Sequence, residues 1–197
     1  MITKSWHTAS IMEIAQHILD EVDRRPAPGG IRVIGVDGCA GSGKSTLAQR
    51  LAALSGAAIV EVDDFVSWDN FSGWWPRFED QVLQPLLAGR DAHYQVRDWA
   101  RDWRGSSLGG WKTLPWQPMV IVEGVTCTRR ETAGRLAYSI WVEAPADQRL
   151  ARGLARDHGQ RYDVSALWAA WMVQEDAFFA ADRTRERADL IVDASDV

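Results

Sequence analysis

The sequence predicts an α/β fold, in which five parallel β-strands form one sheet, helices cover both of its faces and a helical lid lies at one edge. Two observations predict this fold. Short runs of β-branched and other apolar residues, typical of buried strands, alternate along the chain with longer patterns typical of helices. A glycine-rich run also follows the first predicted strand directly and opens the next helix. Because parallel strands need crossover connections, this alternation indicates a parallel sheet.

The same patterns place the individual elements. Apolar runs predict strands at residues 31–36, 57–62, 119–124, 138–142 and 190–192. Amphipathic or helix-favouring stretches predict helices at residues 10–24, 45–53, 78–88, 146–157 and 164–182. Pro85 is expected to shorten or kink the third of these helices. Residues 89–118 show no regular pattern, so we expect a loop that contains short pieces of structure.

The glycine-rich run matches the phosphate-binding loop pattern G-x-x-x-x-G-K-[ST] without a gap. Its glycines let backbone N–H groups turn inward around phosphate oxygens at the positive N-terminus of the following helix. The lysine reaches the outer phosphates, and the serine hydroxyl can ligate Mg²⁺. A glycine-rich surface turn is the alternative, which the strand–loop–helix context disfavours. The predicted nucleotide-binding residues are Gly38, Cys39, Ala40, Gly41, Ser42, Gly43, Lys44, Ser45 and Thr46. The fold expected is therefore the three-layer fold of P-loop NTPases.

Two carboxylates follow predicted strands at the sheet edge where this loop lies. Asp63 follows the second strand, where its side chain could accept the proton of an attacking hydroxyl. A turn or helix cap is the alternative role for Asp63. Glu123 ends the third strand, where a carboxylate could hold Mg²⁺ directly or through water. Asp37 stands just before the loop, and a structural role for it is as consistent with the sequence as a place in the site.

Three arginines recur on one face of the predicted helix at residues 146–157. Arg149, Arg152 and Arg156 are spaced i, i+3 and i+7, and a mobile helix could bring their guanidinium groups to the phosphates of ATP. A solvated basic face is the alternative. Phosphoryl transfer requires mainly that the nucleophile is positioned and that the charge on the moving group is neutralised. Lysine, carboxylates and arginines together could meet both requirements.

Composition excludes several classes of protein. The 197-residue chain carries a net charge of −5, which argues against a protein that coats nucleic acid. We find no basic N-terminal region followed by a long apolar stretch and no run of 18 apolar residues, so we expect a cytoplasmic protein without membrane contact. Cys39 and Cys127 lack the spacing of a zinc site or a disulfide framework. The expected partner is a small-molecule substrate, and a homo-oligomer is left open.

Over most of residues 31–195 the chain resembles the uridine kinase family of P-loop nucleoside kinases. The segments that carry the resemblance are Gly35-Val36-Asp37-Gly38, Val62-Asp63-Asp64-Phe65, the helix end Leu83-x-x-Leu86-x-x-Gly89, Val122-Glu123-Gly124, the arginine helix at 149–157 and the final strand at 187–192. The resemblance implies that Asp63 is the general base and that Ser45 and Glu123 surround Mg²⁺. It also implies that Lys44, Arg152 and Arg156 act on the phosphates, that ATP or GTP is the donor and that a sugar hydroxyl is the acceptor.

The acceptor region departs from that family's pattern. Seven of the eleven tryptophans lie between residues 68 and 116, which suggests an aromatic wall there, although tryptophans mostly fill cores. No acid stands in register with the one that grips the ribose in the family, and the family's Tyr-Asp-Phe-x-x-His stretch is matched only by residues 97–102. The predicted acceptor-binding residues are Trp74, Trp75, Arg97, Asp98, Trp99 and Asp102.

The leading hypothesis is an ATP-dependent kinase that phosphorylates a hydroxyl of a small metabolite, with a uridine-like or cytidine-like nucleoside as the first candidate. A kinase of a non-nucleoside alcohol, such as a pantothenate-like or sugar-like compound, shares every catalytic residue with it. A nucleotide-binding regulatory module without transfer activity is the alternative from another class. We expect one kinase domain over residues 1–197, with an N-terminal helix and linker at 1–29, an acceptor-binding insertion at 68–117 and a lid at 146–163.

Overall fold

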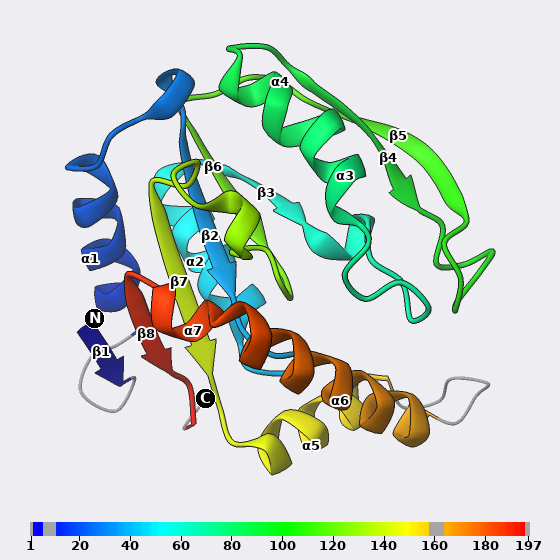
Figure 1. Cartoon of the computed structure of the whole chain (residues 1–197). Coiled ribbons are helices and arrows are strands. Elements are labelled where there is room, and N and C mark those ends of the chain that lie inside the picture. The colour runs from blue at the N-terminus through cyan, green and yellow to red at the C-terminus, as the bar shows by residue number, and fades with distance from the viewer. Residues whose placement is uncertain (1, 6–10, 158–163, 196–197) are drawn as a thin grey trace.

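A computed structural model of the chain describes residues 2–5, 11–157 and 164–195, so the last six residues of the predicted lid lie outside the described part. Its centre is a parallel β-sheet with the strand order β1-β8-β7-β2-β6-β3 (Figure 1). The strands are β1 Ile2–Ser5, β2 Arg32–Asp37, β3 Ala58–Glu61, β6 Met119–Glu123, β7 Tyr138–Glu143 and β8 Leu190–Asp193. The five predicted strands are confirmed, and all five are parallel to their neighbours. The strand β1 extends the sheet beyond β8; its four residues are too few for a sequence pattern to reveal.

The strand β2 lies between β6 and β7. After β2 the chain forms β3 and β6 on one side of it, and it later forms β7 and β8 on the other side. In such a sheet a crevice opens at the carboxyl end of the strand where the direction of winding reverses. The phosphate-binding loop leaves β2 at that end. The topology therefore places the loop beside the ends of β3 and β6.

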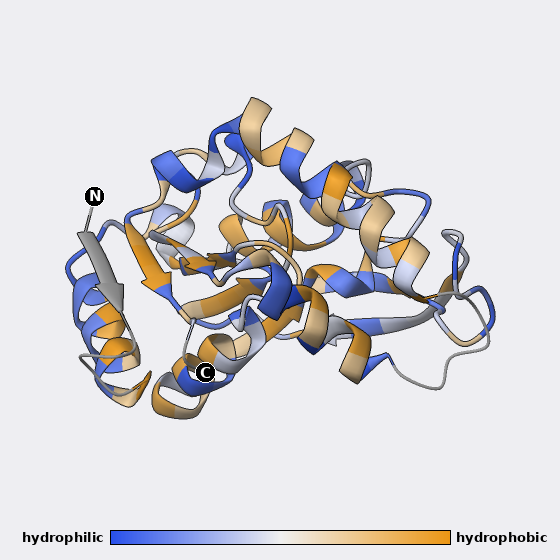
Figure 2. Cartoon of the chain, turned by 90° about the horizontal axis from the view of Figure 1, so that it is seen from below, coloured by the Kyte–Doolittle hydropathy of each residue, from blue (hydrophilic) through white to orange (hydrophobic). Residues whose placement is uncertain are grey.

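Helices cover both faces of the sheet. The helices α1 Ile11–Asp23 and α2 Lys44–Ser55 pack on one face, where Ile34, Ile121 and Ile140 belong to their core cluster. Val33, Val60 and Val120 point to the opposite face, where a second cluster contains most of the buried aromatic side chains. Figure 2 shows hydrophobic residues concentrated on the central strands. The alternation of apolar side chains between two faces is what the buried parallel strands require.

The second face is covered by a helix over residues 75–87 that contains a π turn. It consists of α3 Trp75–Phe78, the π turn Glu79–Leu83 and α4 Gln84–Leu87. Pro85 does not end the helix. Proline has no N–H, and its ring crowds the backbone carbonyl of the residue four positions earlier, which here is Gln81. The π turn that contains Gln81 is wider than an α turn and leaves room for the ring.

The segment expected to be irregular contains a β-hairpin. The strands β4 Ala92–Arg97 and β5 Leu108–Leu114 pair antiparallel as a separate two-stranded sheet. The prediction for this segment was a loop that contains short pieces of structure, and these two strands are such pieces, which the sequence did not identify. The outward-facing β5 carries the pair Gly109-Gly110 and is mostly exposed, so it lacks the apolar pattern of a strand that rests on a core.

Two further helices, α5 and α6, lie below the sheet in Figure 1, near the carboxyl ends of the strands, and a short third helix, α7, leads into the amino end of β8. They are α5 Ala146–Arg156, α6 Val164–Asp182 and α7 Thr184–Arg187, and short 3₁₀ turns occur at Pro28–Gly30, Val62–Asp64 and Arg130–Thr132. The positions predicted for α5 and α6 are confirmed. Within the described ranges, no helix has the length and apolar character that crossing a membrane requires.

Candidate nucleotide and acceptor site

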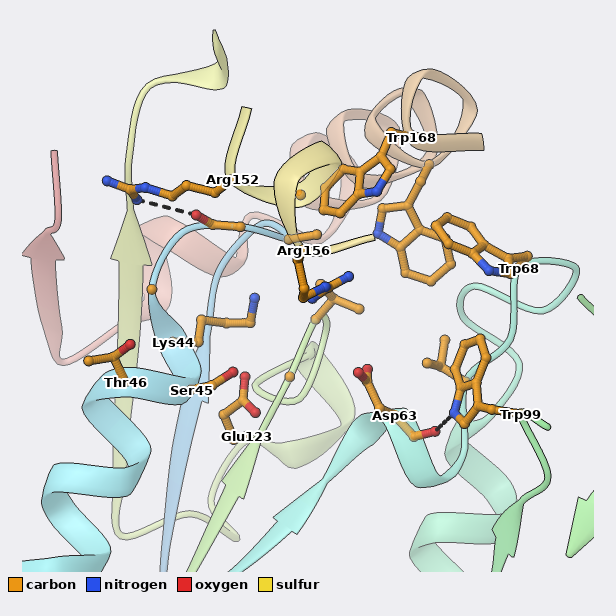
Figure 3. Close-up of a pocket in the computed structure, with 18 residues that line it drawn as sticks. Lys44, Ser45, Thr46, Asp63, Trp68, Trp99, Glu123, Arg152, Arg156 and Trp168 are labelled. Atoms are coloured by element: carbon orange, nitrogen blue, oxygen red, sulfur yellow. Dashed lines mark hydrogen bonds between the residues drawn. The ribbon is translucent and has the colours of Figure 1, made fainter. Parts of the chain in front are cut away.

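A cavity of about 440 Å³ lies at the carboxyl ends of β2, β3 and β6 (Figure 3). Its wall contains the following predicted site residues: Ala40, Gly41, Gly43, Lys44, Ser45, Thr46, Asp63, Trp99, Glu123, Arg152 and Arg156. The remaining wall is formed by Val66, Trp68, Gly124, Val125, Gly153, Trp168 and Trp171. One cavity therefore contains the phosphate-binding loop, both predicted carboxylates, two of the three predicted arginines and an aromatic surface.

The loop is folded as phosphate binding requires. Gly43 has a φ of 99° and is the N-cap of α2, and Lys44, Ser45 and Thr46 of the first helical turn line the cavity, so the positive end of the helix lies at its wall. Gly41 has a φ of 77°, and a Cβ at this position would collide with the backbone of Arg149. Glycine at position 41 thus allows α5 to approach the loop closely. Lys44 is buried, and its ammonium donates a hydrogen bond to the carbonyl of Cys39 at 2.9 Å.

Asp37 anchors the phosphate-binding loop through hydrogen bonds to its buried carboxylate. Its fully buried carboxylate accepts hydrogen bonds from the N–H groups of Gly38 at 2.7 Å, Thr126 at 2.8 Å and Thr128 at 2.7 Å, and from the Thr128 hydroxyl at 2.9 Å. Burial raises the pKa of Asp37 to about 6, although these hydrogen bonds act in the opposite direction. Asp37 is absent from the cavity wall, so its geometry is that of a structural residue.

Glu123 and Ser45 provide oxygen atoms at the foot of the cavity. Glu123 is 8% exposed, and Figure 3 shows its carboxylate beside the Ser45 hydroxyl. Burial, with a smaller contribution from nearby Asp63, raises the pKa of Glu123 to about 7, although Lys44 and a hydrogen bond from Ser45 act in the opposite direction. A hydroxyl and a carboxylate fit Mg²⁺, which takes few protein ligands and completes its shell with water and phosphate oxygens. In the described part of the chain, no larger group of metal-ligating side chains occurs.

Asp63 stands at the opposite side of the cavity from α2, in the turn that follows β3. Its side chain reaches solvent within the cavity, and its carboxylate points toward Lys44 and Arg156 (Figure 3). The surrounding walls limit its hydration and raise the pKa of Asp63, while Lys44 and Arg156 oppose that shift. The backbone carbonyl of Asp63 accepts a hydrogen bond from the indole N–H of Trp99 at 2.9 Å.

The three predicted arginines have different surroundings. Arg152 donates to the carbonyls of Gly41 at 3.3 Å and Ala194 at 3.2 Å. Arg156 lies over the ring of Trp168 at 5.6 Å and pairs with Asp157, and this hydrogen bond raises the pKa of Arg156. Arg149 is buried away from the cavity wall and pairs with a residue of α6 that is described below.

The aromatic wall of the cavity comes from three separate segments. Trp68 follows β3, Trp99 lies in the β4–β5 connection, and Trp168 and Trp171 lie on α6. The rings of Trp68 and Trp171 meet edge to face with centroids 5.2 Å apart. Trp168 and Trp171 were not among the predicted site residues. Their spacing of three residues on one helix was the available signal, but it is equally typical of a helix packed on a core.

The other predicted acceptor-binding residues lie away from the cavity wall. Trp74 and Trp75 are buried in the core cluster, and the indole of Trp74 donates to the Thr126 hydroxyl at 3.1 Å. In the hairpin turn, the Arg97 guanidinium donates to the carbonyl of Asp102 at 2.6 Å, and the Asp102 carboxylate accepts from Gly105 N–H at 2.7 Å. The Asp98 side chain accepts from the N–H of Arg101 at 3.0 Å. These three polar residues therefore organise the turn that carries Trp99.

Residues 34–166 match the model of the AAA domain family, which covers the loop, both cavity carboxylates and α5. Several solved structures are also similar. A protein described as a possible uridine kinase from Bacillus stearothermophilus has a TM-score of 0.61 and 19% identity, and the match covers 90% of this chain and 100% of that one. These likenesses identify the fold as the three-layer α/β fold of P-loop NTPases.

A protein proposed to be a fructose transport system kinase, from Silicibacter sp. TM1040, has a TM-score of 0.59 and 26% identity. The match covers 92% of this chain and 98% of that one. A D-glycerate 3-kinase from Cryptococcus neoformans var. grubii has a TM-score of 0.55 and 11% identity, with 88% of both chains covered. Structures named for several different small-molecule kinases thus share this fold.

Proposed function

Because the chain belongs to the AAA domain family of P-loop proteins, we propose that it transfers the γ-phosphoryl group of ATP or GTP to a hydroxyl of a small molecule. The observation that carries this proposal is that a single cavity contains the phosphate-binding loop on one side and Asp63 on the other (Figure 3). A nucleotide-dependent switch needs only the phosphate-binding loop. A kinase needs both, since the acceptor hydroxyl must be held opposite the donor phosphates.

The phosphate-binding loop and the charged residues of the cavity wall have the following roles in the proposed reaction. The loop N–H groups and Lys44 bind the β- and γ-phosphates, and Arg156 and Arg152 neutralise the charge on the transferring group. Ser45 and Glu123 hold Mg²⁺, which supplies further charge neutralisation when bound. Asp63 accepts the proton of the acceptor hydroxyl as its oxygen bonds to the γ-phosphorus, and the bond from that phosphorus to the β,γ-bridging oxygen breaks to release the nucleoside diphosphate.

The acceptor that we propose first is a uridine-like or cytidine-like nucleoside. Trp68, Trp99 and Trp171 offer indole faces on which a base or the apolar face of a sugar can stack. Apart from Asp63, the acceptor side of the wall carries no carboxylate among the described residues, so little there recognises a ribose diol. A non-nucleoside alcohol that is pantothenate-like or sugar-like is the second candidate, and the 26% identity to the Silicibacter protein, which is proposed to be a fructose transport system kinase, favours a sugar.

The decisive experiment combines an acceptor screen with a single substitution. The full chain with ATP and Mg²⁺ is tested for ADP release against nucleosides, sugars, sugar acids and vitamins that carry a hydroxyl. With the acceptor identified, Asp63→Asn should lower kcat by about 10²- to 10⁴-fold and leave the affinity for Mg·ADP within about threefold.

The matched control is Asp64→Asn, because Asp64 neighbours Asp63 but pairs with Lys112 at 2.8 Å, outside the cavity wall. This variant should keep its activity. Normal turnover by Asp63→Asn would show that the base is assigned wrongly. Binding of Mg·ADP without transfer to any compound of the panel would instead favour the regulatory module.

A further inference from the structure

Glu175 is a buried charged residue of α6, although its neighbours Gln174 and Asp176 are both exposed. Its side chain has no exposed surface. One carboxylate oxygen accepts hydrogen bonds from the backbone N–H of Ala40 at 2.6 Å and from the indole N–H of Trp171 at 2.9 Å. The other oxygen pairs with the Arg149 guanidinium at 3.2 Å. One carboxylate thus has three donors from three segments of the chain.

Each of these donors lies on a different element that contributes residues to the cavity wall. Ala40 is in the phosphate-binding loop and lies on the cavity wall. Arg149 is on α5, the helix that also carries Arg152 and Arg156. Trp171 belongs to the aromatic wall. Among the described residues near the cavity, Glu175 is therefore the point where loop, arginine helix and aromatic wall meet.

Stability alone does not require a carboxylate at this position. A buried ion pair loses much of its Coulomb energy to desolvation, and replacing both of its partners by apolar side chains of similar volume is often neutral, although removing only one of them destabilises the fold. A leucine would fill the space but could accept no hydrogen bond from the loop. The Ala40 N–H would then be left without its acceptor, and the loop would lose a contact that fixes its curvature.

We propose that Glu175 is a positioning residue that holds the phosphate-binding loop in its nucleotide-binding shape and aligns α5 and Trp171 with it. It acts through Ala40 N–H and does not touch the nucleotide. This inference rests on the nucleotide site of the proposed function but not on the transfer step. Nucleotide binding alone therefore tests it, and the probe is Mg·ADP without an acceptor.

Three substitutions of Glu175 distinguish the effect of where the hydrogen-bond acceptor lies from the effect of its negative charge. Glu175→Asp keeps the charge but is one methylene shorter, so it cannot reach Ala40 N–H and Arg149 together. Glu175→Leu keeps the volume and removes the acceptor. Glu175→Gln loses the charge but keeps an oxygen that can accept from Ala40 N–H and Trp171. Asp176→Asn, at the exposed neighbouring position, is the matched control for the glutamine variant.

Affinity for Mg·ADP is measured by calorimetry on the full chain, after thermal unfolding without ligand has shown that each variant is folded. Glu175→Asp and Glu175→Leu should bind about tenfold more weakly, because leucine leaves the Ala40 N–H without an acceptor and the shorter aspartate cannot hold that N–H in place while it pairs with Arg149. Glu175→Gln should stay within about threefold of the natural chain, and Asp176→Asn should be unchanged. If only one of the aspartate and leucine variants folds, the affinity of that variant for Mg·ADP is sufficient to test the proposal.

The opposite ranking, in which Glu175→Gln loses affinity while Glu175→Asp keeps it, would show that charge and not position matters. Unchanged affinity in the aspartate and leucine variants would also overturn the proposal, as would a natural chain that binds no Mg·ADP. If Mg·ADP binds with the expected ranking but no acceptor is phosphorylated, only the proposed function fails.

Discussion

Trp99 is the residue that joins the hairpin to the proposed base. The Arg97 guanidinium lies over its ring at 3.4 Å, and its indole N–H donates to the backbone carbonyl of Asp63. The side chain is 38% exposed and also forms part of the cavity wall. Trp99 can therefore contact an acceptor and at the same time fix the backbone that carries the Asp63 carboxylate.

Trp99→Phe tests this double role. Phenylalanine keeps a ring beside Arg97 but has no N–H, so Asp63 loses the hydrogen bond from the hairpin. We expect kcat/KM for the acceptor to fall about tenfold, the effect of one neutral hydrogen bond, while affinity for Mg·ADP stays unchanged. Steady-state kinetics and calorimetry measure the two quantities. The control is Trp111→Phe, on the exposed face of the same hairpin; an equal loss in both variants would contradict a specific role for Trp99.

At the scale of elements, α5 and α6 meet through a glycine. A Cβ at Gly153 would stand closer to the six-membered ring of Trp168 than carbon atoms approach one another. Gly153 lies between Arg152 and Arg156, and all three residues are on the cavity wall. The small side chain at position 153 thus sets how closely the arginine helix approaches α6.

Gly153→Ala should force α5 and α6 apart. We expect a loss of about 1–3 kcal/mol in the free energy of unfolding, despite alanine's greater helix propensity, because overpacking a tight contact outweighs it. Urea denaturation measures the change, and a weaker affinity for Mg·ADP should accompany it. Gly110→Ala is the control, since nothing lies within 4 Å of a Cβ there, and it should stay within about 0.5 kcal/mol. A stabilised Gly153→Ala chain would contradict the packing argument.

The elements also show where sequence patterns are informative. The strands β2 and β6 are almost entirely buried and have long apolar runs, which predicted them correctly, and the less buried edge strand β3 was predicted from a similar run. The hairpin is stabilised by pairing between β4 and β5 and rests on the core mainly through Ala92, Tyr94 and Leu114, so its pattern is weak. The π turn before Pro85 depends on packing that a local pattern does not encode.

For the whole molecule, the binding of nucleotide and the stability of the fold are linked. Loop, sheet edge and α5 all contribute to one cavity, and a ligand that binds only the folded chain stabilises it. At a concentration 100 times its dissociation constant, Mg·ATP should raise the free energy of unfolding by about 2.7 kcal/mol. Thermal unfolding measures the effect, and chelation of Mg²⁺ should reduce it.

Lys44→Ala should abolish most of this stabilisation, because the ammonium is the cation nearest to the predicted phosphate position in the loop. Lys112→Ala is the control, since Lys112 is half exposed and pairs with Asp64 away from the cavity wall. Equal stabilisation of the natural and Lys44→Ala chains by Mg·ATP would contradict the placement of the phosphates.

The sequence predicted which residues meet at the phosphate-binding loop better than it predicted which tryptophans line the opposite wall of the cavity. The loop, Asp63 and Glu123 follow directly from strand ends, and parallel strands bring those ends together whatever the rest of the chain does. Glu175 and Ala40 are 135 positions apart, and their contact depends on how α6 docks against the loop. Trp74 and Trp75 were selected for residue type, but only packing determines whether a tryptophan faces a core or a cavity.

The separate β4–β5 sheet has a consequence for protein engineering. In the described structure its strands pair with each other and with no strand of the central sheet. It nevertheless carries Trp99 to the cavity, while the phosphate-binding loop is anchored to β2 and Asp37. Under the proposed function, replacing residues 92–114 by the matching hairpin of a solved kinase with this fold should change the acceptor preference only in part, because Trp68 and Trp171 come from other segments, and should leave the affinity for Mg·ADP unchanged. A separately paired ribbon of this kind can be exchanged without rebuilding the central sheet.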